Sequence, residues 1–192
     1  MRKTLVSIVL GFTLLVPAFS HADQIFGDFK RLPDDIERGF SMGADFGMLF
    51  LTGDRRTAQN PGFQLAFTSG YDIMKYLSIE GIYTLAIQEA APPPFDTVLQ
   101  GGVNWFIFDL AAKGQYPIGR WYPFVEAGGG IVYTQPSFTV AGDNYKTSII
   151  IGAGVEYYTY LRHYSLYVKV TYNKMDLPVN AITASAGLKY TF

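Results

Sequence analysis

Hydrophobic and polar residues alternate along most of the chain, in eight segments separated by turn-forming residues. Successive side chains of a β-strand point to opposite faces, so a period of two predicts strands. The predicted strands cover residues 40–51, 63–73, 77–87, 105–117, 123–134, 147–158, 165–173 and 182–192. Short and long connections alternate between them, as expected of consecutive hairpins. The pattern predicts an all-β fold, an eight-stranded antiparallel up-and-down barrel.

The two faces of these strands differ in chemistry. One face is uncharged and rich in Phe, Leu, Ile, Val and Tyr, whereas the other holds glycines and charged residues. A water-soluble barrel has its apolar face inside, and a narrow eight-stranded interior suits small and paired charged side chains. The sidedness therefore predicts a transmembrane barrel whose interior charges are Asp45, Glu80, Asp109, Lys113, Glu126, Glu156, Lys169 and Lys189.

Aromatic residues gather near the ends of the predicted strands. Aromatic rings concentrate at both water boundaries of a membrane barrel, whereas strand propensity alone would scatter them. The predicted girdles consist of Phe50, Phe63, Phe106, Tyr133 and Tyr172 at one end, and Tyr71, Tyr116 and Tyr157 with the last two aromatics at the other. Their segregation supports insertion into a membrane.

The interior charges allow two interpretations. Unpaired charges in a narrow interior would cost several kcal/mol each, so mutual pairing is expected. Paired charges would close the interior, and we expect this structural role. The alternative is a narrow channel for small solutes or apolar compounds.

The amino-terminal end has the layout of a secretory signal peptide. Arg2 and Lys3 precede an apolar run, and a small-x-small site ends at Ala22. We expect residues 1–22 to be the signal peptide, 23–38 a periplasmic arm, and 39–192 the barrel. An even number of strands then places both termini on the periplasmic side of the outer membrane.

The carboxy-terminal end alternates up to a terminal aromatic residue. Gly187, Tyr190 and Phe192 resemble the assembly signal of the final strand in outer-membrane barrels, although an ordinary edge strand could also end in Phe. The expected partners are outer-membrane lipid, the barrel-assembly machinery and other envelope proteins.

The composition argues against several other functions. The chain has no cysteine and two histidines, and 15 basic residues stand against 16 acidic ones. We therefore expect no metal site, no cofactor, no nucleic-acid partner and no catalytic residues. His163 lies two residues from Ser165, but we expect it to cap a turn rather than to activate a nucleophile. A lipid-modifying enzyme and a soluble periplasmic carrier remain alternatives.

The sequence of the central hairpin resembles a known superfamily. YPIGRWYPFV over 116–125, then AGGG over 127–130, and the final strand are similar to the small eight-stranded outer-membrane barrels of the OmpA/OmpW type. This resemblance implies the barrel fold and an outer-membrane location. DIERGF over 35–40 and GVEYYTYLRHYS over 154–165 also resemble the adventurous gliding motility barrels of deltaproteobacteria. That narrower resemblance implies a partner-binding scaffold in a multiprotein motility machine, without catalytic residues.

Overall fold

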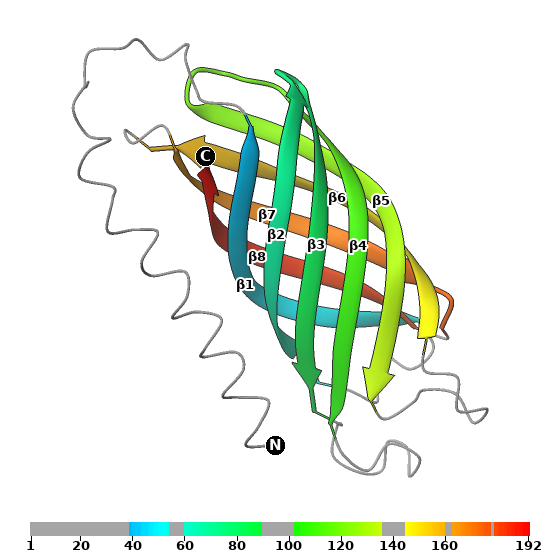
Figure 1. The fold of residues 1–192 in the computed structure, drawn as a ribbon. Helices are drawn as coiled ribbons and strands as arrows, with labels where there is room; N and C mark the ends of the chain where they lie inside the picture. The colour runs from blue at the N-terminus through cyan, green and yellow to red at the C-terminus, as the bar shows by residue number, and fades with distance from the viewer. Residues whose placement is uncertain (1–38, 54–59, 90–101, 136–144, 160–162, 178) are drawn as a thin grey trace. The chain divides into compact units, whose positions relative to one another are not determined.

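The computed structural model describes residues 39–53, 60–89, 102–135, 145–159, 163–177 and 179–192, so the predicted signal peptide (residues 1–22) and the whole of the predicted arm (residues 23–38) lie outside the described residues. Consecutive antiparallel strands form a closed barrel, which confirms the predicted fold (Figure 1). The strands are β1 (Phe40–Gly53), β2 (Gly62–Met74), β3 (Leu77–Gln88), β4 (Val103–Gln115), β5 (Trp121–Gln135), β6 (Tyr145–Tyr158), β7 (Tyr164–Met175) and β8 (Val179–Thr191).

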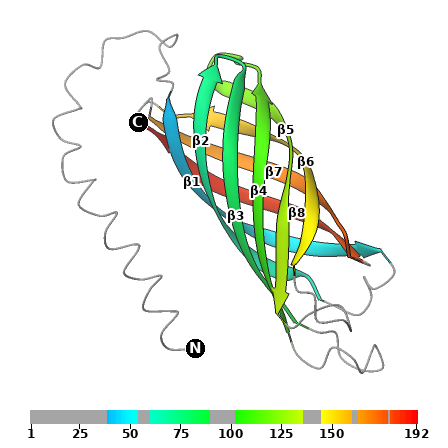
Figure 2. The same cartoon turned by 45° about the vertical axis from the view of Figure 1, so that its right-hand side comes forward.

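The strands wind obliquely around the barrel (Figure 2). Cross-strand partners followed from Phe40 of β1 through all eight strands lead back to Phe50 of β1, ten positions along (40 to 50). With ordinary strand rise and spacing, this stagger corresponds to a strand tilt of about 40°. An eight-stranded barrel of this kind is filled by its own side chains.

Several strands are longer than predicted. β8 begins at Val179 rather than at residue 182, because Val179 pairs with Gly53 and prolongs the β1–β8 ladder. β5 begins at Trp121, before the expected start at Pro123. Pro123 cannot donate a main-chain hydrogen bond, but its carbonyl accepts one from the Tyr116 N–H at 2.9 Å. β4 ends at Gln115, two residues before the predicted end.

A tight hairpin joins β4 to β5. Ile118 and Trp121 exchange main-chain hydrogen bonds of 2.8 and 3.1 Å across Gly119 and Arg120. Gly119 has a φ of 63°, a left-handed conformation that glycine adopts without strain. This turn lies at the end of the barrel where β1 starts and β8 finishes, which we call the terminal end. The opposite end is the loop end.

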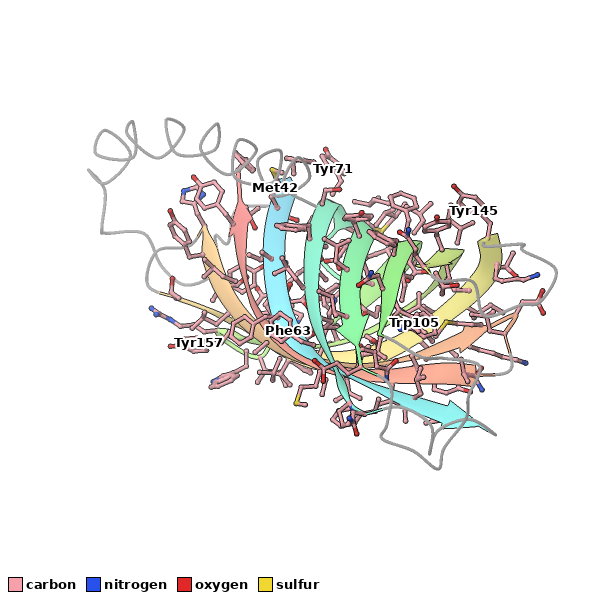
Figure 3. All side chains as sticks on the ribbon, turned by 90° about the horizontal axis from the view of Figure 1, so that it is seen from below. Met42, Phe63, Tyr71, Trp105, Tyr145 and Tyr157 are labelled. Carbon is pink, nitrogen blue, oxygen red and sulfur yellow. The ribbon has the colours of Figure 1, made fainter. Side chains whose placement is uncertain are left out.

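The outward wall of the barrel is apolar. Its exposed side chains include Phe46, Phe108, Leu110, Ile151 and Val168, and Figure 3 shows Tyr71, Tyr145 and Tyr157 projecting from the wall. β7 extends further than predicted and brings Lys174 onto this face at the loop end. Among the described residues, no helix has the length and apolar character needed to cross a membrane.

The ladder between β1 and β8, which closes the barrel, is continuous. β1 and β8 pair over thirteen positions, and the Phe192 N–H donates to the Phe40 carbonyl at 2.9 Å. On the other side of β8, the Thr191 N–H donates to the His163 carbonyl at 2.8 Å and prolongs the β7–β8 ladder. Within the described residues, the barrel therefore has no open sheet edge.

Candidate functional site

The interior of the barrel is the candidate functional site. All eight charged residues that we expected to face inward are buried there: Asp45, Glu80, Asp109, Lys113, Glu126, Glu156, Lys169 and Lys189. They come from seven of the eight strands, because the period of two directs alternate residues into the lumen. Seven of them form two groups of ion pairs, and Asp109 stands apart.

Lys113 is the centre of the tighter group. Its Nζ lies 3.1 Å from Glu80 Oε1 and 2.8 Å from Glu156 Oε2. Lys189 Nζ lies 2.6 Å from the other oxygen of Glu156, and the Ser165 hydroxyl donates to that same oxygen. The Lys113 ammonium also lies 4.2 Å from the centroid of the Phe124 ring. This group, the Lys113 network, links β3, β4, β6, β7 and β8 across the lumen.

Lys169 is the centre of a looser group. Its Nζ lies 3.5 Å from Asp45 Oδ2 and 3.9 Å from Glu126 Oε1. The Tyr167 hydroxyl donates to Asp45 Oδ2 at 2.9 Å, but neither oxygen of Glu126 accepts a hydrogen bond from the described residues. These longer contacts indicate weaker pairing than in the Lys113 network.

Two further acids complete the interior. Asp109 accepts a hydrogen bond from the Ser148 hydroxyl at 2.6 Å, and no lysine of the described residues lies within ion-pair distance of it. Asp72 of β2 is also buried, and our sequence reasoning missed it. The alternation of β2 predicts that Asp72 faces the lumen, because it directly follows the outward-facing Tyr71. In the described lumen, acids therefore outnumber lysines.

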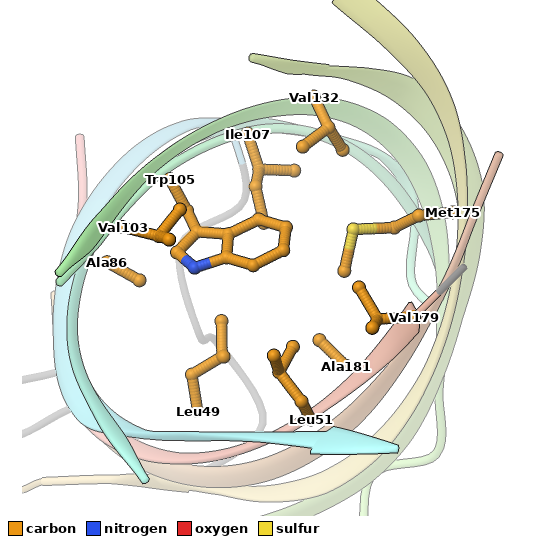
Figure 4. Packing of buried hydrophobic residues seen from close by; sticks show 10 residues of the cluster. All are labelled: Leu49, Leu51, Ala86, Val103, Trp105, Ile107, Val132, Met175, Val179 and Ala181. Atoms are coloured by element: carbon orange, nitrogen blue, oxygen red, sulfur yellow. The ribbon is translucent and has the colours of Figure 1, made fainter. Parts of the chain in front are cut away.

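An apolar cluster fills the part of the lumen nearer the loop end. Figure 4 shows its side chains converging from the wall, with Trp105 reaching furthest across. The Trp105 Nε1–H donates to Gln88 Oε1 at 3.2 Å, so the indole has a polar partner despite complete burial. The members of this cluster are Leu49, Leu51, Ala86, Val103, Trp105, Ile107, Val132, Met175, Val179 and Ala181.

This apolar cluster differs from the prediction, which has small and charged residues throughout the interior. The signal was present in β1, where Leu49 and Leu51 continue the inward positions of Asp45 and Gly47. Large apolar residues at the inward-facing positions near the loop ends of the strands are the sequence signal for this cluster. The lumen thus has a charged section and an apolar section in series.

The predicted girdle residues lie on the outward side of the wall. Phe106 packs beside Tyr133 with ring centroids 5.7 Å apart, and Tyr157 packs beside Trp121 at 4.7 Å. Phe50, Phe63 and Tyr172 are exposed near the loop end, and Tyr71 and Tyr116 near the terminal end.

The aromatic residues that end the chain lie at the terminal end of the barrel. Tyr190 and Phe192 contact each other with centroids 4.8 Å apart, and Phe192 also contacts Phe40 at 5.7 Å. Gly187 lies where the ring of Tyr167 and the main chain of Ala44 approach closely, so a larger side chain there would overlap both.

His163 and Ser165 do not form a pair. His163 Nδ1 lies 2.8 Å from the Thr191 carbonyl oxygen, and its ring stacks on Tyr190. Ser165 is fully buried and donates to Glu156 instead. No three His, Cys, Asp or Glu side chains in the described part of the chain gather in an arrangement able to hold a metal ion.

Comparison with known proteins finds solved structures with a similar fold. Neisserial surface protein A matches with a TM-score of 0.62 at 16% identity, covering 80% of this chain and 97% of that one. Ail, the attachment invasion locus protein of Yersinia pestis, in complex with the heparin analogue sucrose octasulfate, matches with a TM-score of 0.53 at 16% identity, covering 81% and 100%.

Both of these proteins are outer-membrane β-barrels. No protein-family model matches the chain, and no curated protein matches its sequence. At this identity the likeness establishes the eight-stranded barrel fold.

Proposed function

We propose that the chain is an integral outer-membrane barrel with a closed interior, acting as a structural component or a partner-binding scaffold. The observation that carries this proposal is the chemical difference between the outward and inward faces of the barrel wall. Between the barrel ends, the outward positions of the described strands are uncharged, while the acids and lysines are buried inside. Such a wall is favourable against hydrocarbon and unfavourable in water.

Cell fractionation tests this proposal directly. We expect the protein in the outer-membrane fraction, released only by detergent, with faster migration on gels before heating than after, as closed barrels show. A protease added to intact cells should leave an epitope at the carboxy-terminus uncut, because we place both termini in the periplasm. Recovery in the soluble periplasmic fraction without detergent would refute the proposal.

The series arrangement of the lumen supports a closed rather than a conducting barrel. Charged side chains pair across one section, and apolar side chains fill the next. The loose contacts of Lys169 favour a second candidate, a narrow conduit for small ions. Purified protein in planar bilayers should show no current steps. Steps in the wild type that change in Lys113→Ala would favour the conduit.

We propose no catalytic function for this barrel. His163 binds a main-chain oxygen, and Ser165 is buried against a carboxylate, so neither residue forms a nucleophile–base pair. Mass spectrometry of lipid A from cells that overproduce the protein should show no change. A new deacylated or acylated species would identify a lipid-modifying enzyme.

The expected partners are outer-membrane lipid, the barrel-assembly machinery and other envelope proteins, including those of a gliding-motility complex. The resemblance of residues 35–40 and 154–165 to gliding-motility barrels supports the last. Cross-linking and pull-down from envelopes, with a motility assay of a deletion strain, test it. Normal gliding and no envelope partner would restrict the role to the membrane itself.

We also propose that Gly187, Tyr190 and Phe192 act as the assembly signal. The edge-to-face contact between the rings of Tyr190 and Phe192 at the end of β8 supports this role. Phe192→Ala should lower the amount of inserted barrel in cells, whereas Phe63→Ala, which removes an exposed aromatic elsewhere, should not. Equal insertion of both variants would argue for an ordinary final strand.

A further inference from the structure

Three charged side chains from distant strands meet in the middle of the lumen. They are Asp45 of β1, Glu126 of β5 and Lys169 of β7, which we call the Lys169 group. β1 and β5 lie on opposite sides of the eight-stranded barrel, and Lys169 Nζ lies 3.5 Å from the carboxylate of Asp45 and 3.9 Å from that of Glu126. The ammonium therefore lies near the axis of the barrel, with one acid on each side.

The charges of the Lys169 group do not balance. The Lys113 network contains two carboxylates and two ammonium groups, from Glu80, Glu156, Lys113 and Lys189. The Lys169 group contains two carboxylates and one ammonium group, and all three side chains are at least nine-tenths buried. A net charge is unfavourable in a buried site, so the group needs one further positive charge.

The carboxylate oxygens of the group also need partners. Asp45 Oδ1 and both oxygens of Glu126 accept no hydrogen bond from the described residues, and neither does the hydroxyl of Ser185, the cross-strand partner of Lys169. Asp45 uses its other oxygen, Oδ2, for Lys169 and Tyr167. A proton would cancel the excess charge at one oxygen, whereas a metal cation can contact several oxygens at once.

The charge and the donor atoms indicate which cation fits. Carboxylate and hydroxyl oxygens suit hard cations. A divalent cation would leave one positive charge in excess, and no third acidic side chain of the described residues is placed to balance it. The next inward positions toward the loop end on β1 and β5 are Gly47 and Gly128, which extend no side chain into the lumen beside the two acids. We propose that the Lys169 group binds one monovalent inorganic cation, such as Na⁺ or K⁺, between Asp45 and Glu126.

The dependence of stability on this cation tests the inference, which rests on the barrel fold and not on the membrane location. The protein is unfolded with urea in detergent at several concentrations of NaCl or KCl, and tetramethylammonium chloride keeps the ionic strength constant. A ligand of the folded state lowers the unfolding equilibrium constant in proportion to its free concentration. We expect this constant to fall about tenfold for each tenfold rise in Na⁺ or K⁺ above the dissociation constant.

Two variants show where the cation binds. Glu126→Gln removes the excess charge and keeps the shape of the side chain, so it should abolish the dependence on Na⁺ and K⁺. Asp109→Asn is the matched control, because it neutralises a buried acid that hydrogen-bonds to Ser148 and lies outside the group. This control should retain the dependence. Heat-dependent gel migration verifies that each variant is folded.

Thallium(I), which replaces K⁺ in oxygen sites, gives a second measurement on the wild type. Anomalous scattering from crystals grown with thallium(I) should show one peak in contact with Asp45 and Glu126, whether or not Glu126→Gln folds. A peak elsewhere, or equal dependence on Na⁺ in Glu126→Gln and the wild type, would overturn the inference. So would stability that responds to pH but not to Na⁺ or K⁺, because a proton would then supply the missing charge.

Discussion

Lys113 shows how a single buried charge depends on its partners. Its ammonium lies between two carboxylates, and all three groups are at least nine-tenths buried. Because each charge was removed from water on folding, the group is stable only while every member keeps its partners. Replacing one member leaves an uncompensated charge in the lumen.

We therefore expect Lys113→Met to lower the free energy of unfolding by about 3–5 kcal/mol. Urea titration of the purified barrel in detergent or lipid measures this loss. Lys174→Met removes an exposed lysine and should change stability by less than about 0.5 kcal/mol. Similar losses in both variants would mean that the Lys113 network contributes little.

Gly130 illustrates a close approach between strands. A Cβ at this position would overlap the main-chain oxygen of Phe108 on β4, which cannot move without breaking the ladder. Gly130→Ala should destabilise the barrel by about 2–3 kcal/mol. At Gly81 a Cβ would meet nothing closer than the Ser69 hydroxyl at 3.5 Å, so Gly81→Ala should be nearly neutral. The same urea titration distinguishes the two, and an equal effect would contradict the overlap.

At the scale of elements, β4 carries both sections of the lumen. Lys113 near one end joins the charged network, and Trp105 near the other end is the largest member of the apolar cluster. The fully buried indole packs among side chains of β1, β3, β5, β7 and β8. One strand thus contributes to both the charged and the apolar section of the lumen.

Trp105→Ala should cost about 3–5 kcal/mol, because it leaves a cavity among packed side chains. Trp105→Phe keeps most of the volume and loses the hydrogen bond to Gln88, so it should cost only about 1 kcal/mol. Chemical unfolding of both variants gives the comparison. If Phe costs as much as Ala, the hydrogen bond and not the packing stabilises this section.

The element pattern could be predicted because strand periodicity is a local property. Asp45 and Phe46 face opposite sides for purely geometric reasons, and every predicted interior charge is buried. The strand ends were less predictable, since Val179 joins β8 only because Gly53 lies beside it. The partners of Lys113 were also unpredictable. Glu126 is its direct cross-strand neighbour, yet Lys113 binds Glu80, a diagonal neighbour on β3, and Glu156 on β6.

For the whole molecule, two different groups of side chains would act as barriers in the closed lumen that we propose. Ions would have to break the pairs around Lys113 and also cross the apolar cluster around Trp105. Removing either barrier alone leaves the other in place. The barrel should therefore be closed in each single variant.

We expect current steps in planar bilayers only from the double variant Lys113→Ala with Trp105→Ala. Each single variant should stay at the baseline of the wild type. Folded protein, verified by heat-dependent gel migration, is the control for all three. Conduction by Lys113→Ala alone would show that the apolar cluster does not block ions.

The seam between β1 and β8 has a consequence for biogenesis. The first and last residues of the barrel, Phe40 and Phe192, are joined by a main-chain hydrogen bond. Because β1 and β8 pair like any other neighbours, the closed barrel does not require the chain to begin at β1. A circular permutant that fuses 192 to 39 and opens between β5 and β6 should still refold in detergent. In cells it would end on a different strand and lack the exposed aromatic tail, so we expect it to insert poorly. Spontaneous folding and delivery to the membrane would then be separable in one polypeptide.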